Sequence, residues 1–133
     1  MTPLLFVAVC IAGGLGAAAR YLVDSWLWRP GRRLPIGLIA VNATGSLLLG
    51  VVVALGRLTV LDDAITVVLG AGLLGGYTTF SAASLETVRL VLDRRWTAAA
   101  VVGPGMLVLC VALAALGLAA TTGLVTALSP TAG

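Results

Sequence analysis

The sequence lacks histidine and lysine altogether and has only five carboxylates in 133 residues. General acid–base catalysis and most metal centres depend on histidine, on paired carboxylates or on clustered cysteines. The two cysteines, Cys10 and Cys110, both lie in apolar stretches, where cysteine is typically a small packing residue. The sequence also has no zinc-ligand spacing, phosphate-binding loop or basic–aromatic surface. We therefore expect neither an enzyme nor a nucleic-acid-binding protein.

Charge of either sign is scarce, whereas long apolar runs are abundant. Only 10% of the residues are charged and 60% are hydrophobic, which gives a mean hydropathy of +1.15. Four runs contain no formal charge, at positions 1–19, 34–56, 64–85 and 96–133. Each run is long enough to cross a hydrocarbon core of about 30 Å as a helix. The first run lacks the basic start of a signal peptide, so we expect it to remain in the mature protein.

These runs predict an all-α membrane protein with a single four-helix transmembrane domain over residues 1–133. The expected helices span about 3–26, 35–56, 62–92 and 97–122. The third helix is expected to be broken near 75–79. Four helices are too few to enclose a pore comfortably and also pack their glycine faces, so we expect an oligomer.

The net charge of +3 rests on eight arginines, whose positions predict the orientation of the chain. The loops at 27–34 and 93–96 carry five of them, whereas Arg57 is the only basic residue in the loop between. By the positive-inside rule, loops rich in arginine stay in the cytoplasm. We therefore expect a multi-pass protein of the plasma (inner) membrane, with loops 27–34 and 93–96 cytoplasmic and both termini outside.

The third apolar run contains the sequence GGYTTFS at residues 75–81, which is unusual for a helix that faces only lipid. Paired glycine weakens a helix through its backbone entropy, and the hydroxyl side chains compete for backbone hydrogen bonds. Unwound backbone at this depth is tolerated only where protein buries it or where it lines a polar cavity. Such a break offers carbonyl oxygens to a cation and helix N-termini to an anion. Alternatively, the hydroxyls of Thr78, Thr79 and Ser81 only bond to helix carbonyls.

Two further polar side chains each have two interpretations. Arg20 precedes Asp24 by four residues near an expected membrane interface. It is either a snorkelling side chain with a counter-ion or a source of positive potential for an aqueous vestibule that attracts anions. Asn42 lies near the middle of the second run, where an amide needs a partner. It either forms an interhelical hydrogen bond or donates from its NH2 group to an anion in a pore.

Local signals mark the third and fourth helices. Asp62 suits the N-terminus of a helix, and Glu86 precedes Arg89 at the spacing of an ion pair. Pro104 is expected to kink the fourth helix or delay its start. We expect the residues after Gly123 to be frayed.

Three motifs together resemble the CrcB/Fluc fluoride channel family: GGLGAAARY at 13–21, PIGLIAVNATGSLLLG at 35–50 and GGYTTFSAASLE at 75–86. They cover the first three expected helices, in the order and spacing of that family. The resemblance implies a four-helix subunit that forms an antiparallel, inverted dimer with two narrow fluoride pathways along the interface. The implied activity is passive, fluoride-selective export, which reduces the cytoplasmic fluoride concentration.

The resemblance also implies roles for particular residues on the fluoride pathway. Arg20 matches the vestibule arginine of the family, and Asn42 matches its helix-two asparagine. Phe80 matches the first of two phenylalanines whose ring edges, the positive ends of the ring quadrupoles, face fluoride. The hydroxyls of Thr79 and Ser81 flank Phe80 on the same pathway.

A structural sodium ion at the dimer centre is a further implication of the resemblance. In the family, main-chain oxygens at the break in helix three hold this ion, and the matching positions are Gly75 and Thr78. Two carbonyls from each of two subunits give a cation four oxygens in a nearly dry site.

The chain departs from the family pattern on helices three and four. Ala83 stands where the second phenylalanine is expected, and Val102, Met106 and Cys110 replace polar pathway residues of the fourth helix. In addition, a chain whose arginines fix one orientation cannot form an antiparallel dimer with itself. We therefore favour a heterodimer with a homologous subunit of opposite orientation over a homodimer.

Two other functions stay open. A non-conducting structural subunit of a heterodimeric fluoride channel fits the loss at Ala83 and the apolar fourth helix. A small proton-coupled drug exporter shares the size and the inverted assembly, but its mechanism needs a carboxylate within the membrane. The first helix has none before Asp24, and Glu86 lies towards the end of the third helix, so the exporter is the more distant alternative.

Overall fold

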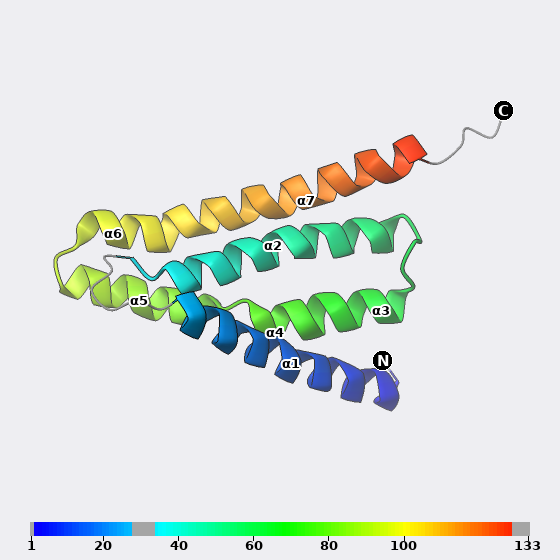
Figure 1. The fold of residues 1–133 in the computed structure, drawn as a ribbon, viewed down its shortest axis with the longest axis horizontal. Coiled ribbons are helices and arrows are strands. Elements are labelled where there is room, and N and C mark those ends of the chain that lie inside the picture. Colours follow the sequence, from blue (N-terminus) through cyan, green and yellow to red (C-terminus); the bar gives the residue numbers. More distant parts are fainter. Residues whose placement is uncertain (1, 28–33, 129–133) are drawn as a thin grey trace.

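The structure of the protein is a computed structural model that describes residues 2–27 and 34–128. Within these residues, four helical segments are long and apolar enough to cross a membrane: Pro3–Leu27, Ile36–Arg57, Asp63–Leu92 and Trp96–Leu128. They form one bundle, and the described ranges contain no strand (Figure 1). The all-α membrane architecture expected from the sequence is therefore confirmed.

The first and second spans are single helices, α1 (Pro3–Leu27) and α2 (Ile36–Arg57). The third span consists of α3 (Asp63–Val67), the π-helical segment η1 (Val68–Leu74), α4 (Gly75–Tyr77) and α5 (Phe80–Leu92). The fourth consists of α6 (Trp96–Ala100), the π-helical segment η2 (Val101–Gly105) and α7 (Met106–Leu128). The start of α1 and the end of α7 lie at the same end of the bundle, as four spans require (Figure 1).

The fourth span continues through Pro104 instead of starting after it. A proline has no N–H, and its ring crowds the carbonyl four residues earlier, so the wider turn of η2 relieves the clash. The same span ends at Leu128, beyond the expected end at about 122. The hydroxyl of Thr126 donates to the carbonyl of Thr122 at 2.9 Å in this extension. The residues from Gly123 to Leu128 are therefore helical and not frayed.

Glycine sets the distance between α1 and the third span. α1 packs along η1 and α4, whereas α2 packs mainly on α7. A Cβ built on Gly16 would overlap the carbonyl oxygen of Leu73, and one built on Gly76 would overlap that of Gly13. The backbones thus meet directly at this crossing, as expected where small residues line a helix interface in a membrane.

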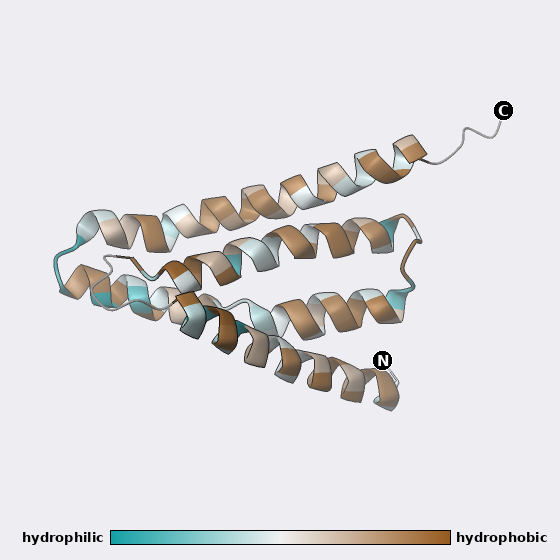
Figure 2. Cartoon of the chain, in the orientation of Figure 1, coloured by the Kyte–Doolittle hydropathy of each residue, from teal (hydrophilic) through white to brown (hydrophobic). Residues whose placement is uncertain are grey.

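The outer surface of the bundle is strongly apolar. Large hydrophobic side chains are exposed on all four spans, and small residues make up much of the buried core. Figure 2 shows hydrophobic colours along most of the spans, with hydrophilic colours at the turns and in α5. A surface of this kind needs lipid or another apolar helix around it. The chain is accordingly a multi-pass membrane protein.

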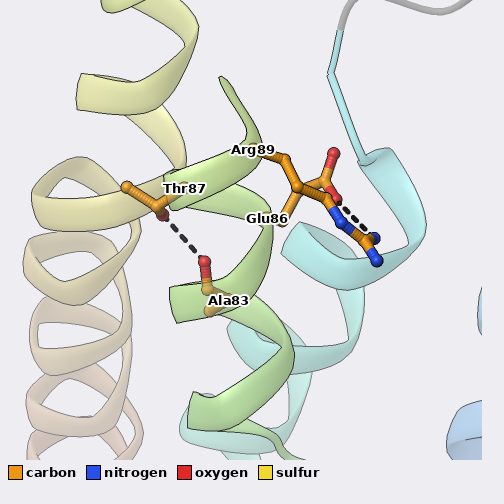
Figure 3. Close-up of polar contacts among 4 residues, drawn as sticks. All are labelled: Ala83, Glu86, Thr87 and Arg89. Atoms are coloured by element: carbon orange, nitrogen blue, oxygen red, sulfur yellow. Dashed lines mark hydrogen bonds and ion pairs between the residues drawn. The ribbon is translucent and has the colours of Figure 1, made fainter. Parts of the chain in front are cut away.

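Two local interactions expected from the sequence are present. Asp62 is the N-cap of α3, and its Oδ1 accepts a hydrogen bond from the amide of Ile65 at 2.8 Å. In α5, Nη1 of Arg89 lies 3.6 Å from Oε2 of Glu86, which forms the expected ion pair (Figure 3). Most of the basic loop expected at 27–34 lies outside the described residues.

Candidate functional site

The third span is interrupted at two residues. α4 ends at Tyr77, and Thr78 and Thr79 are extended, with ψ angles of 159° and 119°, before α5 begins at Phe80. The paired glycines Gly75 and Gly76, which the sequence suggested would weaken the helix, are helical and precede the break. The second of them, Gly76, instead allows α1 to approach the third span closely.

Asn42 of α2 stabilises the extended residues. Its Oδ1 accepts a hydrogen bond from the amide of Thr79 at 2.9 Å, and its Nδ2 donates to the carbonyl of Leu38 at 3.0 Å. These partners fix the orientation of the amide, because the N–H needs an acceptor and the carbonyl needs a donor. Asn42 thus forms the interhelical hydrogen bond that was one of its two interpretations. Its second Nδ2 hydrogen has no partner in the part of the chain that the structure describes.

The same hydrogen bonds leave carbonyl groups at the end of α4 without their usual donors. In a continuous helix, the amide of Thr79 would bond to the carbonyl of Gly75, and the amide of Ala82 to that of Thr78. Here the amide of Thr79 donates to Asn42, and the amide of Ala82 donates to Oγ1 of Thr79 at 3.3 Å. Freed carbonyls are suited to a cation. The two positions matched to main-chain cation ligands, Gly75 and Thr78, are therefore compatible with that role.

The hydroxyl groups at the break bond mainly within the third span. Oγ1 of Thr78 donates to the carbonyl of Leu74 at 2.9 Å, which is the simple helix-bonding alternative for this residue. Oγ1 of Thr79 caps α5 and lies 3.3 Å from Oγ of Ser81. Ser81 is exposed, so its hydroxyl is accessible to a ligand or a partner chain.

A groove of about 530 Å³ runs beside the break, between α2, the third span and the first half of the fourth. Five of the seven candidate site residues line it: Asn42, Gly75, Thr78, Thr79 and Phe80. The other two, Arg20 and Ser81, are not part of its lining. The structure therefore brings most of the candidate site to one surface.

Three further hydroxyl residues, which were not predicted as site residues from the sequence, also line the groove: Ser46, Ser84 and Thr87. Ser46 follows Asn42 by four residues, and Ser84 follows Phe80 by four, which places each pair on one helical face. This spacing was the signal that would have identified both serines from the sequence.

The departures from the family pattern all lie on the wall of the groove. Ala83 and Met106 are buried, Val102 is fully buried, and Cys110 is half-buried. The hydroxyl of Thr87 donates to the carbonyl of Ala83 at 2.8 Å, so it is engaged within α5 (Figure 3). This side of the groove is consequently apolar.

Phe80 is the most exposed large side chain at the break. Its exposed fraction is 80%, although it also borders the groove. The next residue, Ser81, is also exposed, whereas Thr79 is half-buried with its hydroxyl at the N-cap of α5. Nothing within the described residues covers the ring of Phe80, which leaves it available to a second chain.

Arg20 lies on α1, apart from the groove. It is half-buried, and its Nε atom is buried without a hydrogen-bond partner in residues 2–27 and 34–128. The same residues contain no ion pair between Arg20 and Asp24. The counter-ion interpretation of Arg20 therefore finds no support in the structure.

A second polar link between α2 and the third span was not expected. The hydroxyl of Tyr77 lies 3.2 Å from Oγ1 of Thr44, which itself donates to the carbonyl of Ala40 at 2.7 Å. Because the single hydroxyl hydrogen of Thr44 is thereby used, Tyr77 donates to Thr44. This bond holds the end of α4 against α2, and no sequence spacing signals it.

Replacing Asn42 with leucine is expected to destabilise the fold by about 1–3 kcal/mol, because the amide of Thr79 loses its acceptor in a buried setting. Thermal unfolding in detergent measures this loss. Thr44→Val is the matched control on the same helix, because it removes the exposed contact with Tyr77 and the bond to the carbonyl of Ala40 but leaves the amide of Thr79 bonded to Asn42. Equal melting temperatures for Asn42→Leu and wild type would contradict the role of Asn42 at the break.

Comparison with known proteins places these features in a family. The family model described as CrcB-like protein, Camphor Resistance (CrcB), matches residues 7–118. The "Fluoride-specific ion channel FluC 1" of Leifsonia xyli is 49% identical over 119 residues, which cover 89% of this chain and 87% of that protein. The "Fluoride-specific ion channel FluC" of Geobacter metallireducens is 38% identical over 117 residues, covering 86% and 94%. The chain therefore belongs to the CrcB-like family.

Proposed function

We propose that this chain is a subunit of a fluoride-selective ion channel that exports fluoride passively across the plasma membrane. The observation that carries the proposal is the break at Thr78 and Thr79, held by Asn42 and followed directly by the exposed ring of Phe80. The similarity to relatives named as fluoride-specific ion channels supports fluoride as the ion.

The proposed pathway begins at the cytoplasmic side, where the positive charge of Arg20 attracts the anion. Fluoride then loses water against the free Nδ2 hydrogen of Asn42, the edge of Phe80 and the hydroxyl of Ser81. The ring edge carries partial positive charge, so it stabilises a desolvated anion without the strong binding of a full cation. Fluoride then leaves down its gradient, and this passive pathway needs no catalytic group.

We also propose that the carbonyl oxygens of Gly75 and Thr78 hold a structural sodium ion together with a second subunit. These two carbonyls are suited to a cation because the amides of Thr79 and Ala82 donate to side chains instead. Both carbonyls therefore lack the donors that a continuous helix would give them. Gly75 is exposed, and a Cβ at this position would meet nothing closer than 3.7 Å, so a second chain can approach it. The ion would supply positive charge that stabilises the partial negative charges of these carbonyl oxygens at the subunit contact.

A homologous subunit of opposite orientation is the proposed partner. The outward side of the break exposes Phe80, Ser81 and Thr44, and polar backbone at this depth must be covered by protein. The arginine bias of loops 27–34 and 93–96 gives the chain one orientation, with these loops in the cytoplasm and both termini outside. An inverted partner must then be a different chain.

Fluoride efflux from liposomes tests the proposal. Vesicles loaded with fluoride receive this chain alone or together with a homologous subunit of opposite arginine bias, and a fluoride electrode records release after the membrane potential is relieved. We expect efflux only from the pair. Efflux from the lone chain would contradict the heterodimer, and absence of efflux from both preparations would contradict the channel.

A second candidate function is that of a non-conducting subunit, and the apolar wall at Ala83, Val102 and Met106 is the observation that favours it. In this case the partner's pathway carries all the fluoride. Efflux from the pair would then be insensitive to changes of Phe80 in this chain.

A further inference from the structure

The turn between α5 and α6 holds two arginines in a defined backbone geometry. The amide of Arg94 donates to the carbonyl of Val91 at 3.0 Å, and the amide of Arg95 donates to the carbonyl of Leu90 at 2.8 Å. This pair of hydrogen bonds is a Schellman motif, which ends a helix with one residue in the left-handed conformation. Arg94 is that residue, with a φ angle of 57°. Because Leu90 is only 2% exposed, the motif is anchored in the core.

Arginine is an unusual residue at the left-handed position. Glycine is favoured there, because a Cβ crowds the backbone in this conformation. Thr59 is the other non-glycine residue with a positive φ in the described ranges, and its hydroxyl donates to the carbonyl of Leu58 at 2.7 Å. The guanidinium of Arg94, by contrast, is exposed and forms neither an ion pair nor a hydrogen bond within residues 2–27 and 34–128. The turn does not need this side chain for its own geometry, which points to a role in binding something else.

A cavity of about 470 Å³ lies beside the turn. Its described lining consists of two polar and three apolar residues: Arg95, Thr97, Leu34, Ala98 and Val101. Leu34 and Ala98 also pack on one buried cluster, so the segment before α2 and the start of the fourth span are held together here. The described part of the lining contains no carboxylate. The cavity therefore combines a basic residue with apolar walls.

The turn lies at the level of a membrane interface. It joins the third and fourth spans at one end of the bundle (Figure 1). Trp96, the first residue of α6, is 64% exposed, and exposed tryptophan is typical of the headgroup level of a membrane. Asp93 reduces the charge of the turn, but Asp93, Arg94 and Arg95 together retain a net charge of +1. Phospholipid headgroups therefore surround a basic turn with an apolar cavity beside it.

We propose that Arg94, Arg95 and the cavity beside them form a binding site for one anionic phospholipid, with its phosphate at the two arginines and part of an acyl chain against the apolar wall. The positive charge favours an anionic headgroup over a zwitterionic one. The apolar wall favours a lipid over a free phosphate ion, because only the lipid buries apolar surface there. The turn belongs to the loop proposed to be cytoplasmic, and the cytoplasmic leaflet carries negative surface charge. This inference goes beyond the proposed channel and does not depend on fluoride conduction.

Lipid titration of the purified full chain in neutral detergent, followed by native mass spectrometry, tests the proposal. Dioleoyl phosphatidylglycerol and dioleoyl phosphatidylcholine share their acyl chains and differ in headgroup charge. We expect phosphatidylglycerol to bind about tenfold or more tightly, since each arginine near an anionic headgroup contributes about fivefold. Arg94→Gly and Arg95→Gln are each expected to lower its affinity about fivefold. Arg57→Gln is the control, because Arg57 is exposed at the end of α2, in the loop between the second and third spans.

Arg94→Gly separates lipid binding from folding, because the two expected effects differ in sign. Glycine suits the left-handed conformation, so the melting temperature without added lipid should be unchanged or higher than that of the wild type. The affinity for phosphatidylglycerol should nevertheless fall. A lower melting temperature would mean that the side chain of Arg94 holds the turn together, and it would overturn the assignment of this residue to a lipid. If Arg94→Gly does not fold, Arg95→Gln decides alone.

Three other results would overturn the proposal. Equal affinity for the two lipids would exclude selection of the headgroup by charge. A loss of affinity in Arg57→Gln as large as in Arg95→Gln would mean that any surface charge suffices. Inorganic phosphate that displaces phosphatidylglycerol at equal concentration would indicate a site for a free anion. None of these measurements uses fluoride, so a chain that binds phosphatidylglycerol but gives no efflux would contradict the channel and support the lipid site.

Discussion

Replacing Phe80 with isoleucine is expected to reduce fluoride efflux from the assembled channel by about tenfold or more. The aromatic edge supplies a favourable interaction with a desolvated anion that an aliphatic side chain cannot replace. An interaction of about 1.4 kcal/mol corresponds to a tenfold change in rate. Because the ring is 80% exposed in this chain, the substitution removes little of the chain's own packing. Efflux and folding are therefore separable at this residue.

Phe6→Ile is the matched control for Phe80→Ile, since Phe6 is the other phenylalanine of the chain and is also exposed, at 60%. It lies on α1 and does not line the groove. Both variants are measured in liposomes with the partner subunit, after equal incorporation is verified. Wild-type efflux from Phe80→Ile would show that this ring is only a packing element, and it would favour the non-conducting subunit.

Gly76→Ala is expected to destabilise the fold by at least about 3 kcal/mol, the upper end of the cost of overpacking. The added Cβ would overlap the carbonyl oxygen of Gly13 and lie 2.9 Å from its Cα. These atoms belong to the backbone of α1, so no side-chain rotation relieves the clash. α1 must move away from α4, and the residues after α4 then lose their alignment with Asn42.

Thermal unfolding in detergent measures the effect of Gly76→Ala, and Gly14→Ala is the control. No atom lies within 4 Å of a Cβ at Gly14, so alanine there should gain about 1 kcal/mol of helix propensity. The two substitutions are chemically identical and opposite in expected sign. Equal melting temperatures for Gly76→Ala and wild type would contradict the direct backbone contact between α1 and the third span.

The sequence alone determined the features that depend on local composition. Uncharged runs long enough to span a membrane predicted four helices, because lipid requires each backbone to satisfy its own hydrogen bonds. The cap at Asp62 and the pair of Glu86 with Arg89 followed from spacing within one helix. A break near residues 75–79 followed from residues that compete with helical hydrogen bonds, and it lies at Thr78 and Thr79.

Only the tertiary structure decided which side chain holds the break and which residues contact other helices. The acceptor of the Thr79 amide is a side chain 37 residues earlier, and the contact of Asp24 with α2 crosses a loop. The glycine pair is helical, and its second member, Gly76, allows the backbone of α1 to approach closely. It does not mark an unwound segment. Such facts depend on which helix faces lie together, and the periodicity of a single segment contains no information about its neighbour.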